Sequence, residues 1–176
     1  MNVQITKEKL VEMYVEVDDL RLAYLDFLRS QDEEISSKIP QTQLNGSEVT
    51  TILCAYHLSG YKNFENYYRA MVLAELLEDF PDAPCYETFL GYIPKSLPLV
   101  LLWMMYTCGR AQRTGLYFID SKKLQVCHLR REHSHKVFNE VARKGKTSTG
   151  WFYGLKIHLV INNLGEIVSF KLTPTR

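Results

Sequence analysis

Two stretches of the chain decide the fold: GLYFIDSKKLQVCH at residues 115–128 and GWFYGLKIHLVINNLGEIVSFKLTP at residues 150–174. In the second, apolar and polar residues alternate over 151–162 and again over 166–173, with many β-branched and aromatic side chains, which is typical of strands. The Asn-Asn-Leu-Gly sequence at 162–165 supplies residues that tolerate the positive φ of a tight reversal. This stretch is therefore predicted to be a β-hairpin.

A short apolar run at 116–119 predicts a further strand beside the hairpin. The sequence thus predicts three antiparallel strands. Asp120 follows the apolar run directly. We expect its carboxylate at the C-terminal end of the first strand, open to solvent and to a metal ion.

The first part of the chain is predicted to be helical. Apolar residues recur at spacings of three and four over residues 7–28 and form one stripe. Ser47 is a candidate N-cap for a second helix that ends near Gly60. Further helices are predicted at 63–77, 86–92 and 97–108. The last is apolar nearly all round, so we expect it in the core.

These patterns predict the α+β class. We expect an all-α N-terminal domain over residues 1–110, followed by the antiparallel three-stranded sheet over residues 111–176. Within the first domain, residues 47–70 resemble two helices of a helix-turn-helix, whose second helix enters the major groove of DNA. That helix offers few cationic side chains, and helix pairs of this kind are common in all-α domains, so simple packing is slightly favoured.

Charge is distributed unevenly, although the formal net charge is only +1. Residues 1–34 are rich in acids, whereas residues 110–156 are rich in Lys and Arg. A basic half of this kind is typical of a surface that faces phosphates. The candidate DNA-contacting cations are Lys122, Lys123, Arg130, Arg131, Lys136, Arg143, Lys144, Lys146 and Lys156.

Several motifs resemble a known family. FIDSKKLQVCH, REHSHKVFNEVARKGKTSTG and GWFYGLKIHLVINNLGEIVSFKLTP resemble the start of the catalytic domain of DDE transposases from bacterial insertion sequences. Upstream, GSEVTTILCAYHLSGYKNFENYY and CYETFLGYIPKSLPLVLLW resemble the helical N-terminal region of the same proteins, which commonly holds the ends of the element. The resemblance runs from Leu44 onward. It implies that the sheet is the start of an RNase H-like core, incomplete in this chain.

The resemblance carries over one catalytic residue. In the family two aspartates and a glutamate hold Mg²⁺ or Mn²⁺ for DNA strand cleavage and transfer, and the first aspartate matches Asp120. The other two acids lie well downstream in relatives, so we expect a truncated, frameshifted or degenerate copy that is catalytically incomplete. Two-metal phosphoryl transfer needs carboxylates that bridge ions about 3.5–4 Å apart, and one aspartate does not make that site. Glu132, Glu140 and Glu166 are interpreted as solvated surface charges rather than ligands.

The basic stretch between the first strand and the hairpin contains Cys127, His128, His133 and His135, which are potential zinc ligands. Their spacing matches no usual structural zinc pattern. A flexible, basic, DNA-contacting loop is the favoured interpretation.

Three aromatic residues, Trp151, Phe152 and Tyr153, open the hairpin. Such side chains are able to stack on a flipped base. At the head of a half-buried strand they more often pack in the sheet, and packing is the favoured interpretation.

The sequence favours a cytoplasmic protein with no membrane partner, and the resemblance implies that it is nucleoid-associated. Residues 1–17 are charged throughout and lack the apolar core of a signal peptide. The apolar run at 97–106 is too short to span a bilayer. The expected partners are DNA, as the terminal inverted repeats of an element, and a second copy of the chain or intact transposase.

Two functions follow from these observations. The first is a transposase that cuts and joins DNA with metal ions. The alternative is a non-catalytic DNA-binding or self-associating fragment that inhibits intact transposase. A pseudogene product without a selected role is a third interpretation, which the sequence does not separate from the second.

Overall fold

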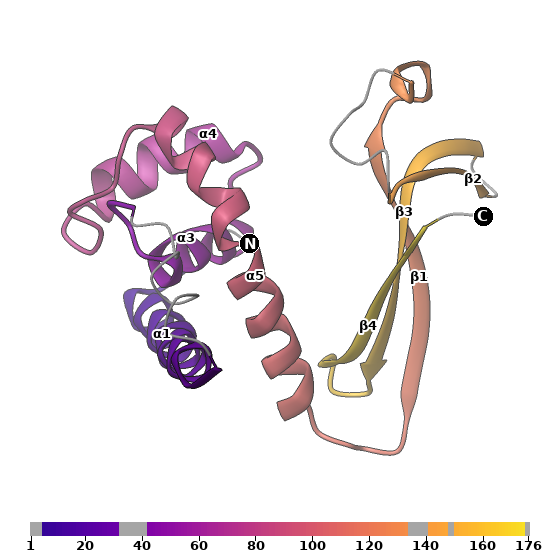
Figure 1. Ribbon diagram of the computed structural model, residues 1–176, viewed down its shortest axis with the longest axis horizontal. Coiled ribbons are helices and arrows are strands. Elements are labelled where there is room, and N and C mark those ends of the chain that lie inside the picture. The colour runs from indigo at the N-terminus through magenta and orange to yellow at the C-terminus, as the bar shows by residue number, and fades with distance from the viewer. Residues whose placement is uncertain (1–4, 32–41, 134–140, 148–149, 175–176) are drawn as a thin grey trace. The chain divides into compact units, whose positions relative to one another are not determined.

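The computed structural model describes residues 5–31, 42–133, 141–147 and 150–174 (Figure 1). The chain divides into two compact units, Met1–Trp103 and Met104–Arg176. The first consists of helices. The second contains the end of the last helix and an antiparallel sheet, so the predicted α+β class is confirmed.

Helices account for the first unit and follow most of the predicted segments. Their bounds are α1 Lys7–Gln31, α3 Gly46–Leu58, α4 Phe64–Tyr67, the π-helix η1 Tyr68–Glu75, and α5 Tyr86–Arg110. The apolar stripe predicted for α1 turns Leu10, Met13 and Val17 into the interior. The third predicted helix is also present, as α4 continued by η1.

The N-terminus of α3 is capped by Asn45 rather than by Ser47. The Asn45 side chain accepts hydrogen bonds from the backbone N–H groups of Ser47 (2.8 Å) and Glu48 (2.9 Å), and the Glu48 carboxylate accepts one from the Asn45 N–H (2.7 Å). This is a capping box, which needs the three-residue spacing that Asn45 has to Glu48. The Ser47 hydroxyl instead donates to Asp18 of α1 at 2.9 Å. Gly60, at φ +77°, lies just beyond the end of α3 as predicted.

Aromatic rings form the centre of the helical core. Tyr67, Tyr68 and Phe89 are fully buried. The rings of Tyr68 and Phe89 lie 4.5 Å apart, centroid to centroid. The two tyrosine hydroxyls donate to the backbone carbonyls of Ile52 (3.1 Å) and Pro84 (2.8 Å). Both tyrosine hydroxyls are therefore satisfied, and these bonds add to the apolar packing of the core.

One helix, α5, replaces the two that the sequence predicts at 86–92 and 97–108. It continues through Pro94 and Pro98. Its buried residues are Phe89, Ser96 and Leu99, whereas Leu97 and Leu101 are nearly half exposed, so the expectation of a wholly central helix is wrong. A helix that is apolar nearly all round does not reveal from sequence which face it buries.

The apolar run at 97–106 is part of this longer helix. The whole helix is long and apolar enough to cross a membrane by length and composition alone. That is weak support for a membrane span, because core helices of soluble proteins meet the same criteria. Lys95 lies within the helix, and a lysine at the centre of a bilayer costs about 2.5–3.5 kcal/mol on insertion scales.

The second unit is built on a central strand, β3 Gly150–Asn162. Strand β1 Tyr117–Cys127 pairs antiparallel with one side of β3 along its length. On the other side β3 pairs first with β2 Arg143–Thr147 and then with β4 Ile167–Pro174 (Figure 1). The three predicted strands are thus present, in the predicted pairing, and β2 is an additional strand.

The predicted turn between β3 and β4 is confirmed. Gly165 adopts φ +84°, a conformation that favours glycine. Asn162 is buried, and its side-chain oxygen accepts hydrogen bonds from the backbone N–H groups of Leu164 (3.0 Å) and Glu166 (2.9 Å). The turn is therefore fixed by a side chain as well as by the backbone.

Candidate functional site

The candidate metal-binding acid, Asp120, lies inside β1 rather than at its end. It is the fourth residue of a strand that continues to Cys127, and it pairs with Leu159 of β3. The predicted end was wrong because Ser-Lys-Lys looks like the exit from a strand. Polar residues remain in a strand when one face of an antiparallel sheet meets water. The Asp120 carboxylate is exposed and accepts a hydrogen bond from the Ser121 N–H at 2.7 Å.

Strand register divides the sheet into two chemically different faces, because alternate residues point to opposite sides. The face that carries Asp120 is mostly apolar and is called the apolar face here. Its members are Phe118, Leu124, Leu155, Ile157, Leu159, Ile161, Phe170 and Leu172, together with Asp120 and Lys122. Phe118 is 58% exposed and Leu172 46%. Asp120 is therefore a single carboxylate within a largely hydrocarbon surface.

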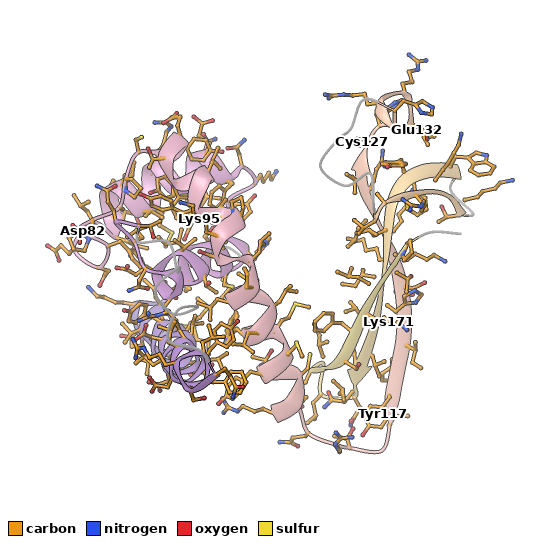
Figure 2. The ribbon with its side chains drawn as sticks, viewed as in Figure 1. Asp82, Lys95, Tyr117, Cys127, Glu132 and Lys171 are labelled. Carbon is orange, nitrogen blue, oxygen red and sulfur yellow. The ribbon has the colours of Figure 1, made fainter. Side chains whose placement is uncertain are left out.

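The opposite side of the sheet, called the polar face here, includes Ser121, Lys123, Lys156, His158, Lys171 and Thr173, together with Tyr117, Ile119 and Val160 toward one end. Lys123 pairs directly with Lys156, and His158 with Lys171. The His158 ring nitrogen Nε2 lies 3.0 Å from the Thr173 hydroxyl. Figure 2 labels Tyr117 and Cys127 at opposite ends of β1, with Lys171 between them along the sheet. Three lysines thus form a cationic surface on the side opposite Asp120.

Lys171 is a basic residue that the sequence reasoning missed. Pairing of β3 with β4 places Lys171 across from His158, but the turn at 162–165 alone does not predict this, because the register shifts by one residue between Val160 and Ile161. Lys123 and Lys156, both predicted to contact DNA, lie together on the polar face. Lys122 was also predicted to contact DNA. It lies on the apolar face, two residues from Asp120 along β1.

The remaining predicted cations lie just after the C-terminal end of β1 and in β2. Arg143, Lys144 and Lys146 belong to β2, and Arg130 and Arg131 belong to a 3-10 turn at Leu129–Arg131. All five are exposed. Lys136 lies outside the described residues. The segment predicted as a flexible loop therefore contains the second half of β1, the 3-10 turn and β2. Its composition is too polar to show a period of two, and backbone pairing with β3 forms the strand.

The candidate zinc ligands are not brought together where the structure describes them. Cys127 ends β1, and the His128 ring nitrogen Nδ1 accepts a hydrogen bond from the Arg130 N–H at 3.3 Å. The His133 side chain is 92% exposed, beside Glu132, and His135 is outside the described residues. Within the described ranges, no group of three or more His, Cys, Asp or Glu side chains is placed to hold a metal ion.

Of the three glutamates interpreted as solvated surface charges, the structure describes Glu132 and Glu166. Glu166 is a structural residue, because its carboxylate accepts hydrogen bonds from the Asn162 side chain (2.7 Å) and from the Gln112 N–H (2.9 Å). These two donors, Asn162 first, lower the pKa of Glu166 below its usual value. The Glu132 side chain is 17% exposed, so it is not the solvated charge predicted, and Glu140 is outside the described residues.

The structure does not favour the helix-turn-helix interpretation of residues 47–70. Tyr67 and Tyr68, at the head of the second helix, are buried and belong to the core. Arg69 forms ion pairs with Glu65 (2.9 Å) and Glu87 (2.8 Å). The three side chains that a recognition helix would present are thus used in packing and in ion pairs, as the packing interpretation expects.

Residues 110–176 match the family model of the transposase DDE domain. The match confirms the resemblance of this part of the chain to the transposase DDE domain. The match includes Asp120 and all of β1–β4. Comparisons with curated proteins and with solved structures gave no significant match.

Proposed function

We propose that the chain serves as part of the transposase of a bacterial insertion sequence, with the ends of the element as its DNA substrate. In this proposal Asp120 is the first of the acids that hold Mg²⁺ or Mn²⁺, and the basic surfaces of the sheet unit hold the DNA backbone. The observation that supports it is the position of Asp120, an exposed carboxylate inside a strand of the family-matched segment.

The acids that the structure describes do not complete a two-metal site around Asp120. Such a site needs several carboxylates, because each ion must exchange water for protein oxygens while both stay about 3.5–4 Å apart. Asp120 supplies one carboxylate, and the described residues place no group of acids around it. We therefore expect DNA binding without cleavage from these 176 residues alone.

A cleavage assay on element ends tests the catalytic part. The 176-residue polypeptide is expected to leave the DNA intact with Mg²⁺ or Mn²⁺. A version joined to the following segment of a related DDE domain is expected to cut, and its Asp120→Ala variant is not. Metal-dependent cutting by the short polypeptide would contradict the incomplete site. Activity of the joined Asp120→Ala variant would contradict the role of Asp120.

Salt dependence tests the DNA-binding part. Lys and Arg side chains that neutralise phosphates release counterions, so affinity falls as salt rises. Changing Arg130, Arg131, Lys144 and Lys146 together to Ala is expected to lower the slope of log K against log salt by about 3–4. The matched control changes four lysines of the helical unit, Lys7, Lys9, Lys62 and Lys95, and is expected to keep most of that slope. Equal losses in both variants would place the contacts elsewhere.

The second candidate function, an inhibitory fragment, has one observation in its favour. The apolar face exposes large side chains such as Phe118, Leu124 and Leu172, and exposed apolar patches commonly mark protein interfaces. Mixing the polypeptide with an active DDE transposase from a related element tests this function. Inhibition that persists at saturating DNA supports contact between the proteins, whereas inhibition relieved by extra DNA supports competition for the element ends.

A further inference from the structure

One exposed aromatic side chain near the β2–β3 connection is not used by the core. Trp151 is 56% exposed, whereas its neighbours Phe152 and Tyr153 are 1% and 8% exposed. The packing interpretation of this aromatic trio therefore holds for Phe152 and Tyr153 and fails for Trp151. A tryptophan that remains more than half in water contributes little apolar burial, so its ring is accessible to a ligand.

Two lysines of β2 flank the indole ring. The Nζ atoms of Lys144 and Lys146 each lie 5.6 Å from the Trp151 ring centroid. Strand register accounts for this arrangement, because Lys146 pairs with Trp151 and Lys144 is two residues away on the same face. Cation–π attraction at an exposed site of this kind is worth about 0.5–1 kcal/mol. It holds both ammonium groups close to one aromatic surface.

This combination fits one class of ligand. A nucleotide carries an aromatic base that stacks on an indole ring and a phosphate that accepts hydrogen bonds from ammonium groups. In duplex DNA both faces of an internal base are already covered by its neighbours. The site is therefore suited to a base that is unpaired or that has left the stack.

We propose that Trp151, Lys144 and Lys146 form a stacking site for an unpaired nucleotide of the DNA substrate. The proposal deepens the proposed function and rests on it, since it specifies which form of DNA this surface takes. Trp151 lies eight residues (159 − 151) from Leu159, the partner of Asp120. Eight residues of strand span about 26 Å, so the stacked nucleotide is distinct from the one next to Asp120.

The polar face offers a useful contrast. It carries Lys156 and Lys171 with His158, and its neighbouring ring, Phe152, is buried. Such a surface binds phosphates of single and double strands alike. The Trp151 site should instead distinguish the two forms, because only a single strand presents free base faces.

Anisotropy titrations of the 176-residue polypeptide test the site with a labelled oligothymidylate of about twelve nucleotides, and with a duplex of equal length. Trp151→Ala is expected to weaken single-strand binding about 5- to 100-fold and duplex binding by less than about twofold. Trp151→Phe keeps an aromatic face and should recover most of the loss. Lys144→Ala with Lys146→Ala should weaken both forms and reduce their salt dependence.

Two controls separate a lost site from a lost fold. Phe27→Ala removes another exposed aromatic ring, 58% exposed, from the helical unit and should change neither affinity. Duplex binding that Trp151→Ala retains shows that the variant is folded. Equal effects of Trp151→Ala on both DNA forms, or no effect, or no single-strand binding by the unchanged protein, overturn the stacking site. If the unchanged protein shows no salt-dependent binding to the duplex, that result instead contradicts the proposed function.

Discussion

The helical unit and the sheet unit differ in how completely they bury their large apolar side chains. In the helical unit a cluster around Tyr67, Tyr68 and Phe89 is closed to solvent. In the sheet unit the fully buried large side chains are few, and Phe118 and Ile119 of β1 are 58% and 77% exposed. Apolar burial supplies most of the free energy of folding, so the two units should differ in stability as well as in architecture.

The difference also separates structure from function. The helical unit uses its aromatic and charged side chains in packing and in ion pairs, as Tyr67 and Arg69 illustrate. The sheet unit leaves Asp120, Trp151 and the basic residues of β2 at the surface. Its strands are held by backbone pairing and register, which leave the side chains available for ligands. The region richest in candidate contacts is thus the one with the smallest core.

The largest expected effect is on the helical core. Phe89→Ala should lower the free energy of unfolding of the helical unit by about 3–5 kcal/mol, because it removes a fully buried ring. Phe118→Ala removes the same ring from the exposed apolar face, so a change within about 0.5 kcal/mol is expected for the sheet unit. Urea unfolding, with helical circular dichroism and hydrogen exchange of β1–β4 as separate readouts, measures both.

Similar losses of unfolding free energy from Phe89→Ala and Phe118→Ala would contradict the expected difference in stability between the units. That outcome would mean that Phe118 is covered by protein in solution. Concentration-dependent stability would then identify a second copy as the cover, since association stabilises by mass action.

The next effect concerns a close backbone approach within the sheet. A Cβ atom at Gly154 would lie 2.0 Å from the carbonyl oxygen of Leu124, so β1 and β3 would have to separate at their irregularity between Gln125 and Cys127. Gly154→Ala should therefore destabilise the sheet unit by about 1–3 kcal/mol. At Gly91 in α5 an added Cβ meets nothing within 4 Å beyond the adjacent residues and the nearby helix backbone, and Gly91→Ala should stabilise the helix by about 0.5–1 kcal/mol. Opposite signs in thermal unfolding are the expected result.

The sequence predicted best where a local signal and its tertiary role coincide. The alternating pattern of β3 and β4 with a turn at 162–165 is such a case, because register and turn residues point to the same hairpin. Asp120, the candidate first acid, was expected in the strand that pairs with β3, and the structure places it there. Its pairing with β3 followed from the same pattern.

Prediction failed where the deciding contact lies outside the segment. Strand β2, with the sequence RKGKT, has no apolar period and exists because β3 offers a free edge. Separate helices were predicted at 86–92 and 97–108, yet one helix, α5, continues through Pro94 and Pro98. The exposure of Trp151 beside buried Phe152 depends on what covers each face, which the pattern of three aromatics does not encode.

A smaller effect is expected at the start of α3. Asn45→Ala removes the acceptor for the Ser47 and Glu48 N–H groups and should cost about 0.5–2 kcal/mol. Asn45→Asp retains an acceptor oxygen and is the control. If unfolding of the helical unit is unchanged by Asn45→Ala, then Ser47, the cap expected from the sequence, has taken over the N-terminus of the helix.

The smallest expected effect is on the pH dependence of the stability of the sheet unit. The pKa of Glu166 is lowered first by the hydrogen bond from the Asn162 side chain and then by that from the Gln112 N–H. A carboxyl whose pKa is lower when folded stabilises the fold above its usual pKa of 4.5, and this contribution is lost as pH falls through the lower, folded value. Hydrogen exchange or thermal unfolding of β3 and β4 should therefore weaken in that acidic range. Glu166→Gln should remove this part of the pH dependence, while Glu75→Gln, in the helical unit, should leave the profile of the sheet unit unchanged. A Glu166→Gln profile that keeps the full acid-induced loss would show that other carboxyls hold the hairpin.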